Sequence, residues 1–504
     1  MSAMTNFRHF RSLSFRQSKN VPKCRDLVIA IFVRRLYSYQ MKKSANLGRR
    51  SFVMLGSLIT AGIFAPRELR AIAKGALFTE NKIYVCTPCG LDCDKLEFDK
   101  PGTCPVCAMP LIEKGATAAV SGPGSARFPE GKTSVQFPFE LLANGIFFQI
   151  QVNNKGPLTF ALDTGSFNSI VASEIVDQLG IQTGATSKGL GSGTSFTTSQ
   201  ISSLDFLLPG DLTLSTKRGA AISLGNLSAL IARRFDGILG FDVLGQLVVQ
   251  IDYQRRMITL HDPAHFEYKG VGTVMPFTFW SNYDPQIEGE ILIADQSPMP
   301  VKIALDTGAG GTTLTTPFVT AHRLTESMKT LQSPDVGAGG GESVKWEGRG
   351  HQLRIGSLVI DRPLFALSTD TVGSLAHAEF DLNLGGNILR RFTTIIDYPG
   401  KRLILEPNSD FHKPFASDAS GLVLKAEGPE HKTFIVRALV PNSPATEAGV
   451  QVGDIITAID GSSSGKYALW EFEEELKKSG RVVELKLRRG QTSFKRKLKL
   501  QSLL

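Results

Sequence analysis

The feature of this sequence that most constrains its fold is an internal repeat of about 145 residues. Three segments recur in the same order at nearly one spacing. Segment 160–166, FALDTGS, recurs as 303–309, IALDTGA; segment 235–244 recurs as 380–389; and segment 251–260 recurs as 396–405. A repeat of this length indicates two copies of one folding unit that pack against each other.

Both copies have the pattern of an all-β fold. From residue 133 onward, short runs of β-branched and aromatic residues alternate with Gly, Pro, Asn and Asp, and no long amphipathic helix interrupts them. We expect a first half at 133–268 and a second half at 269–410. A segment rich in Gly, Ala, Ser and Pro, 115–132, precedes them and is predicted to be a linker. A chain of 504 residues also has room for further domains.

The net charge of +9 belongs to the N-terminal segment. Residues 1–50 hold 12 of the 56 Lys and Arg and one of the 47 acidic residues, so the rest of the chain has 44 basic against 46 acidic side chains. A nearly neutral body argues against an extended face for nucleic acid.

The N-terminal segment, 1–73, has the layout of an export signal. From Met41 a basic stretch is followed by an uncharged run, 51–65, and an A-x-A site, 71–73. The pair Arg49-Arg50 resembles the twin-arginine signal for folded proteins. We therefore expect translation to start at Met41 and a protein of the periplasm or cell envelope, either released or held by its signal segment. The Arg- and Ser-rich residues before Met41 leave an organellar transit peptide open.

Each repeat contains Asp-Thr-Gly directly after a short apolar run. A single copy could be an ordinary turn, because all three residues favour turns. Two equivalent copies, each followed about 75 residues later by a further apolar element, favour a pair of aspartates that act together. The later element is Ile-Leu-Gly at 238–240 but Asn-Leu-Gly at 383–385.

This arrangement resembles the aspartic peptidases of retropepsin type, over about 270 residues. Their half-unit carries apolar-apolar-Asp-Thr-Gly, a flap, and a later apolar-apolar-Gly, from which Asn383 departs. The resemblance implies a mainly β fold, in which two retropepsin-like barrel halves form a pseudo-dimer within one chain. It also implies that Asp163 and Asp306 meet on the pseudo-two-fold axis and share a proton and a water.

Electrostatics indicates how such a pair would work. Two carboxylates about 4 Å apart repel by roughly 4 kcal/mol at an effective dielectric of 20, or about three pKa units. One would stay protonated as a general acid while the other acts as a base. The resemblance gives supporting roles to the neighbouring residues of both loops. Because a hydroxyl follows only the first loop, we expect Asp163 to ionise more readily. The supporting residues are Thr164, Gly165, Ser166, Thr307 and Gly308.

A glycine cluster lies between each Asp-Thr-Gly and its later apolar element, at 189–193 and 337–341. Each could form a mobile flap over a substrate. An ordinary hairpin loop explains the same glycines equally well, and both interpretations stay open.

A separate segment, 84–114, holds five of the six cysteines. Cys86, Cys89, Cys104 and Cys107 form two CxxC pairs with the spacing of a four-thiolate zinc site. The segment resembles the short heavy-metal-binding domain of metal exporters and periplasmic proteins, which implies a structural zinc ribbon. Two disulfides are the alternative for an exported protein. Cys93 has no assigned role.

The C-terminal region, 419–502, resembles the PDZ domains attached to bacterial proteases. The carrying run is SPATEAGVQVGDIITAIDG at 443–461. The resemblance implies an α+β domain that binds an extended C-terminal peptide by strand addition. Its groove helix would span 469–478, and its carboxylate loop and edge strand would contain Gly421, Leu422, Val423 and Leu424. The alternative is a PDZ domain that only packs on the catalytic unit.

Together these patterns predict an exported aspartic endopeptidase that acts on proteins or peptides. It would need no cofactor for catalysis, bind no nucleic acid, and contain no integral membrane domain beyond the signal segment. Two other functions remain open: an envelope binding or scaffold protein, and a metal-handling protein that works through its ribbon. A G-x-S-x-G match at 461–465 lies in a polar turn and gives little support to a serine hydrolase.

Overall fold

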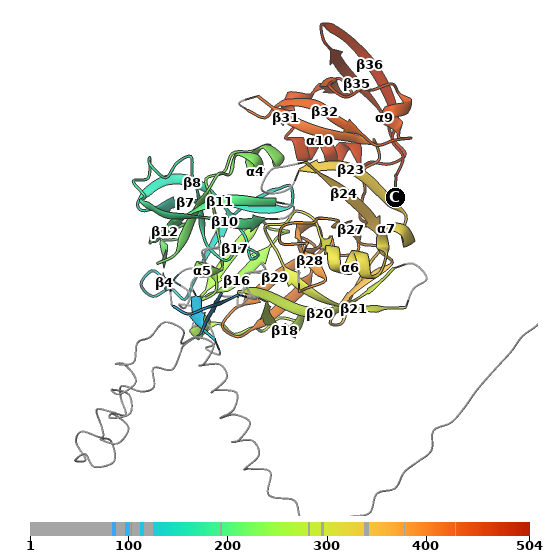
Figure 1. The fold of residues 1–504 in the computed structure, drawn as a ribbon. Helices are drawn as coiled ribbons and strands as arrows, with labels where there is room; N and C mark the ends of the chain where they lie inside the picture. The colour runs from blue at the N-terminus through green and yellow to red at the C-terminus, as the bar shows by residue number, and fades with distance from the viewer. Residues whose placement is uncertain are drawn as a thin grey trace, which may run out of the picture. The chain divides into compact units, whose positions relative to one another are not determined.

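The computed structural model of the protein describes residues 83–86, 96–100, 102, 111–114 and 124–504, apart from 192–193, 281–282, 294–296, 337–341, 377–378 and 429. Its fold is mainly β, as predicted, and short helices connect the strands (Figure 1). None of the helices in this part of the chain is long and apolar enough to cross a membrane.

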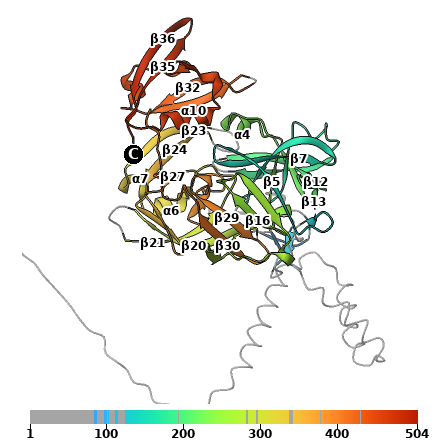
Figure 2. The same ribbon diagram turned by 180° about the vertical axis from the view of Figure 1, so that it is seen from behind.

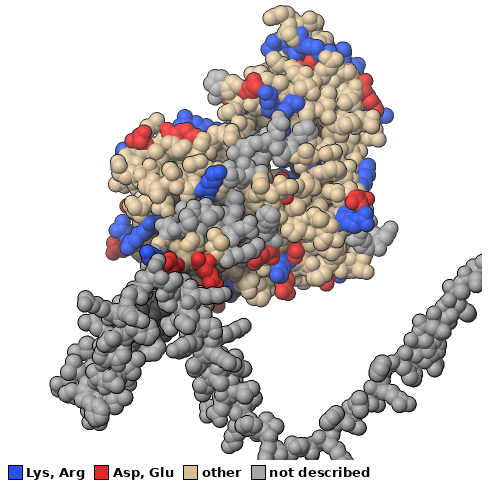
Figure 3. Space-filling view, viewed as in Figure 1, with Lys and Arg blue, Asp and Glu red and all other residues tan. Residues whose placement is uncertain are grey.

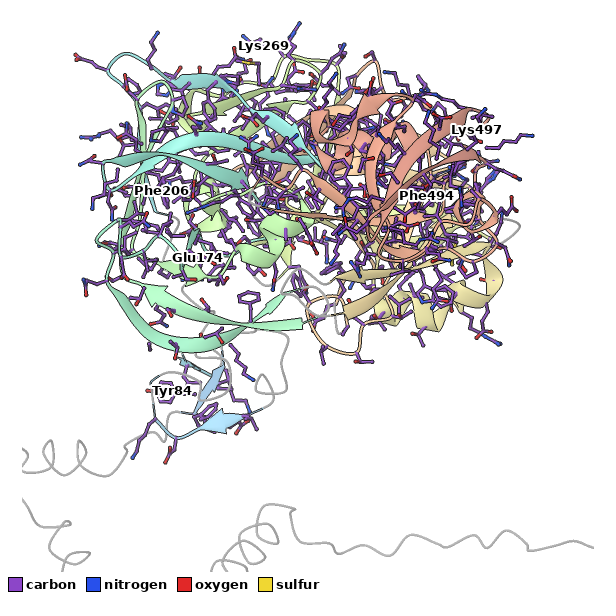
Figure 4. The ribbon with its side chains drawn as sticks, turned by 90° about the horizontal axis from the view of Figure 1, so that it is seen from above. Tyr84, Glu174, Phe206, Lys269, Phe494 and Lys497 are labelled. Carbon is purple, nitrogen blue, oxygen red and sulfur yellow. The ribbon has the colours of Figure 1, made fainter. Side chains whose placement is uncertain are left out.

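The first half is built on one curled sheet, along whose strands buried and more exposed side chains alternate. Phe206 is one of the buried residues (Figure 4). Its helices are α4 (Gly225–Leu230) and α5 (Phe241–Leu244). The strand order is β10 (Thr183–Gly191), β11 (Thr194–Ile201), β14 (Gly219–Ile222), β9 (Ile170–Ala172), β15 (Gly237–Leu239), β8 (Lys155–Leu162), β7 (Gly145–Val152), β12 (Leu204–Leu208), β13 (Leu212–Thr216) and β4 (Ser125–Arg127), with β6 (Glu140–Leu142) on β7.

The second half repeats this strand order, as two copies of one unit should. Its helices are α6 (Thr316–Ala321), α7 (Leu324–Ser327) and α8 (Gly386–Leu389). The order is β23 (Thr330–Val336), β24 (Glu342–Arg349), β27 (Leu364–Leu367), β22 (Thr313–Leu314), β28 (Leu382–Leu384), β21 (Met299–Leu305), β20 (Asp284–Leu292), β25 (Gln352–Ile355) and β26 (Leu358–Asp361), with β19 (Thr278–Trp280) on β20.

A further sheet joins the two halves at their base (Figure 2). Its two central strands come from different halves and pair antiparallel, with Val248 opposite Asp397. Ile251 and Ile396 are fully buried here, so one hydrophobic core runs through both halves. The strand order is β18 (Thr273–Pro276), β30 (Arg402–Pro407), β29 (Phe392–Asp397), β16 (Val248–Asp252), β17 (Met257–His261) and β5 (Ser134–Pro138); η2 (Pro263–His265) follows β17.

The C-terminal domain has its own core, centred on Phe434 and Phe472. Strand β31 is an edge strand of its sheet. The elements are β31 (Leu422–Glu427), β32 (Thr433–Leu439), α9 (Pro444–Glu447), β33 (Ile455–Ile459), β34 (Ser462–Ser463), η3 (Ser464–Lys466), α10 (Leu469–Leu476), β35 (Val482–Arg489) and β36 (Thr492–Lys499). Helix α10 ends at Leu476, two residues before the end predicted for the groove helix.

Two N-terminal regions differ in how they meet the predictions. Residues 84–114 contain a small sheet in which β1 (Tyr84–Cys86) pairs with β2 (Glu97–Phe98) and β3 (Leu111–Glu113); Tyr84 is labelled in Figure 4. The predicted linker is partly wrong, because β4 pairs with β13 and extends the first sheet.

Positive and negative side chains are interspersed on the face shown in Figure 3, which fits the neutral body expected from the sequence.

Candidate active site

Both predicted aspartates directly follow equivalent strands. Asp163 comes after β8 and Asp306 after β21, and each of these strands pairs in parallel with the later apolar element of its own half. The Asp163 amide donates to the Leu239 carbonyl oxygen at 3.0 Å, and the Asp306 amide donates to the Leu384 carbonyl oxygen at 3.1 Å. The later apolar elements therefore hold the two loops in matching positions.

The threonines of the two loops bind each other's backbone across the interface between the halves. The Thr164 amide donates to Thr307 Oγ1, and the Thr307 amide donates to Thr164 Oγ1, each at 3.1 Å. Each hydroxyl in turn donates to a carbonyl oxygen of the opposite strand, that of Leu305 at 2.8 Å or Leu162 at 2.9 Å. Both threonines are fully buried, so this predicted cross-axis contact fixes the two loops against each other.

The glycines let the carboxyl groups approach. A Cβ added at Gly165 would lie 2.9 Å from Asp306 Cγ, and one added at Gly308 would lie 2.4 Å from Asp163 Cγ. Either contact is too close for any side chain. The structure thus brings Asp163 and Asp306 together and explains why glycine occupies both positions.

The two aspartates have unequal surroundings. Burial, then the charge of Asp306 and a hydrogen bond with its side chain, raise the pKa of Asp163 well above its usual value. Asp306 instead accepts a hydrogen bond from Asn383 Nδ2 at its Oδ2, at 2.7 Å. Ile238 occupies the equivalent position beside Asp163 and has no donor to offer. A donor favours the charged form of a carboxylate, so the proton stays on Asp163.

This asymmetry corrects the expectation that Asp163 would ionise more readily. That expectation relied on Ser166, but the Ser166 hydroxyl donates to the Asn168 carbonyl oxygen at 2.9 Å. The Asp163 carboxylate accepts from the Gly165 amide at 2.9 Å. Asp306 accepts from the amide of Ala309, the counterpart of Ser166, at 2.8 Å, and the Ser166 amide also interacts with Asp163. Each carboxyl group thus has a backbone donor, whereas only Asp306 has a side-chain amide, that of Asn383.

Sequence reasoning noted Asn383 only as a departure from the family pattern. The signal was present, since an amide replaces an apolar residue in an otherwise repeated element. Sequence reasoning also missed Asp284, a buried carboxyl group whose pKa is raised by burial and then by the charges of Asp306 and Asp163. No motif marks this residue, because it lies 22 positions before Asp306 on the neighbouring strand.

The first glycine cluster lies at the end of the β10–β11 hairpin. Strand β10 includes residues 189–191, so the first cluster is partly strand rather than loop. The Ser374 amide of the second half donates to the Gly191 carbonyl oxygen at 3.2 Å. This hairpin therefore reaches across to the other half. The second cluster, 337–341, lies outside the described residues.

The predicted carboxylate loop of the C-terminal domain already contains a carboxylate. Asp418 accepts from the Ser420 amide at 3.1 Å and from the Gly421 amide at 2.6 Å, and the Leu422 amide donates to Ser420 Oγ at 3.0 Å. The amides of this loop are thus satisfied within the domain, which corrects the prediction that they are free for a peptide terminus. The edge of β31, with Val423 half-buried and Leu424 buried, remains as predicted.

The predicted zinc ligands fall mostly outside the described residues. Cys86 ends β1, but its side chain and those of Cys89, Cys104 and Cys107 are not described. Of the four cysteines only Cys86 lies in a described strand, and the zinc ribbon stays a prediction.

Comparisons with known proteins agree with two of these regions. Residues 148–243 match the aspartyl protease family, and residues 435–489 match the PDZ domain family. No curated protein matches the chain. Among solved structures, the photosystem II D1 C-terminal processing protease is 25% identical over 17% of this chain, with a TM-score of 0.16. The matched part spans only 23% of that chain, so it bears on neither fold nor activity here.

Proposed function

We propose that the protein is an aspartic endopeptidase whose two halves each supply one carboxyl group to a single site. The observation that carries this proposal is the reciprocal threonine contact, which holds Asp163 against Asp306. The aspartyl protease match covers the first half and includes Asp163. The second half has the same strand order and supplies Asp306.

The unequal surroundings of the two carboxyl groups suggest their roles. Asp306, which accepts a hydrogen bond from Asn383, acts as the base. It takes a proton from a water molecule while the water oxygen bonds to the peptide carbonyl carbon. Asp163 acts as the acid and gives its proton to the carbonyl oxygen. When the C–N bond breaks, the proton on Asp306 passes to the leaving nitrogen and the hydrated carbon returns a proton to Asp163. Both groups are then in their starting states.

The PDZ domain is proposed to bind extended peptide segments along β31. Its match to the PDZ family and the position of β31 at the edge of its sheet support this role. Since Asp418 holds the loop amides, segments without a free terminus should bind as well as C-terminal ones.

The N-terminal features complete the proposal. The signal-like segment 1–73 supports export to the periplasm or cell envelope. The two CxxC pairs support one structural zinc, held by four thiolates. Metal analysis of the purified protein should find about one zinc per chain, lost in Cys86→Ser. Two disulfides and no zinc would overturn this part of the proposal.

Cleavage of a mixed peptide library by the purified protein tests the main proposal. Asp163→Asn and Asp306→Asn should each lower kcat/KM by roughly 10²–10⁴-fold, because each removes one half of a coupled acid-base pair. The double variant should be scarcely worse, as expected for groups that act as a unit. No cleavage by the unaltered protein would favour a scaffold. Two additive losses would indicate independent sites.

A further inference from the structure

A third carboxyl group lies beside the two aspartates, and it belongs to one half only. Asp284 begins β20, where Ile287 pairs with Ile303. In the first half, Phe148 pairs with Phe160 in the equivalent register. Phe160 and Ile303 each lie three residues before their aspartate, so the counterpart of Asp284 is Gly145. The first half therefore has no side chain at this position.

The Asp284 side chain is 4% exposed. Its Oδ1 has no hydrogen-bond partner within the described part of the chain. After burial, the causes that raise its pKa are the charges of Asp306 and Asp163, both of the same sign as its own. A buried carboxylate normally has a cation or several donors around it, because its desolvation is costly. The raised pKa keeps Asp284 neutral while it has no partner, and a cation placed beside it would allow it to ionise.

The ring of Tyr283, the residue before Asp284, belongs to an aromatic cluster. It lies 5.0 Å from the Phe167 ring and 6.4 Å from the Trp280 ring, measured between centroids. Burial and the nearby carboxyl groups raise the pKa of Tyr283, so its ring stays neutral. The Arg218 guanidinium lies 4.9 Å from the centroid of Phe167, so a ring of this cluster already has a cation beside it.

We propose that Asp284, with the rings of Tyr283 and Phe167, forms a subsite that binds a lysine or arginine side chain of the substrate. The inference rests on the proposed peptidase function, since the subsite borders the pair that would cleave the peptide. An ammonium or guanidinium group gives Asp284 the donors that it lacks and stabilises its ionised form. The aliphatic stem packs on the rings. A neutral side chain leaves Asp284 unpaired, and an acidic one adds repulsion.

Matched peptide libraries test this subsite. One library holds a single arginine at varied positions in a decapeptide, and its twin holds citrulline, which has nearly the same shape without the charge. The unaltered protein should cleave the arginine library at a fixed distance from that residue. Its kcat/KM should be roughly 10–100-fold above that for citrulline. In Asp284→Asn this ratio should fall to about 2-fold. Glu288→Gln, an exposed change on the same strand, should keep the ratio of the unaltered protein.

Three outcomes separate this inference from the proposed function. An unchanged ratio in Asp284→Asn, with a thermal midpoint showing that the variant is folded, overturns the subsite. Cleavage by the unaltered protein without preference for arginine also overturns the subsite and leaves the peptidase standing. If nothing is cleaved, the peptidase proposal fails, and binding of both libraries to Asp163→Asn, with and without Asp284→Asn, decides the subsite. Equal binding of arginine and citrulline peptides would then overturn it.

Discussion

Asn383 and Ile238 occupy equivalent places, yet they give the two aspartates different chemistry. The Asn383 amide donates to Asp306, whereas Ile238 is buried beside Asp163 and offers only apolar surface. A hydrogen bond to a carboxylate favours its ionised form, and apolar burial favours its neutral form. At the scale of single residues, this one amide supports the proposed roles of Asp306 as the base and Asp163 as the acid.

A reciprocal pair of variants tests this assignment. In Asn383→Ile the proposed base, Asp306, loses its side-chain hydrogen bond, so kcat/KM should fall. In Ile238→Asn a donor is added beside Asp163. The added donor lowers the pKa of Asp163, which burial and Asp306 raise in the unaltered protein. Asp163 therefore loses its proton at a lower pH, and the basic limb of the kcat/KM profile should move to lower pH. The measurement is kcat/KM for one peptide across the pH range.

Only the basic limb should move in Ile238→Asn. Movement of the acid limb instead would reverse the roles of Asp163 and Asp306. An Ile238→Asn profile that only scales down, with both limbs in place, would mean that residue 238 acts through packing.

The sequence carried much of this site but not its asymmetry. The two Asp-Thr-Gly loops carried the resemblance to retropepsin-type peptidases, and that resemblance predicted that Asp163 and Asp306 meet. Which of the two carboxyl groups keeps the proton depends on the side chain that the neighbouring parallel strand places beside it. Strand register decides that side chain, and a short motif does not contain the register. Asp284 was missed for the same reason, since it reaches the pair from a neighbouring strand.

At the scale of elements, one arginine secures the segment that follows the second half. Arg391, just after α8, is 4% exposed and its guanidinium donates to backbone carbonyl oxygens of residues 410–414. Its Cζ lies 3.5 Å from the Phe415 ring centroid. Burial lowers the pKa of Arg391 to about 10, so it remains charged at neutral pH. Among the described residues this segment pairs with no strand, and Arg391 donates to four of its carbonyl groups instead.

Arg391→Met should therefore destabilise the protein by roughly 2–4 kcal/mol, because several part-buried carbonyl groups lose a charged donor at once. Thermal or urea unfolding measures the loss, and limited proteolysis should cut faster within 408–418. Arg323→Met, which removes an exposed ion pair with Glu326, is the matched control and should change stability by less than about 0.5 kcal/mol. Equal effects of the two variants would contradict the anchoring role.

At the scale of the whole molecule, the sheet shared by the halves makes the site intramolecular. Strands β16 and β29 pair over five residues and carry part of the common core. Each half thus completes the other within one chain. Two chains need not meet for Asp163 to contact Asp306.

Mixing the two inactive single variants tests this point. Asp163→Asn and Asp306→Asn combined in one solution should show no more activity than either alone, because each molecule keeps its own defect. Asn preserves the shape of the side chain, so both variants should still fold. Size-exclusion chromatography of the mixture supplies the control. Activity that appears on mixing and grows with concentration would show that the aspartates pair between chains.

The same shared sheet has a consequence for how the two sides of the site could diverge. In an assembly of two identical chains, every substitution appears twice, once on each side of the axis. Here the two halves occupy separate stretches of one sequence and can change independently. Asn383 can therefore stand where the first half has Ile238, and Asp284 where it has Gly145. Joining the halves in one polypeptide released the site from enforced symmetry. A peptide has a direction, and a site that is no longer symmetric can distinguish one end of its substrate from the other.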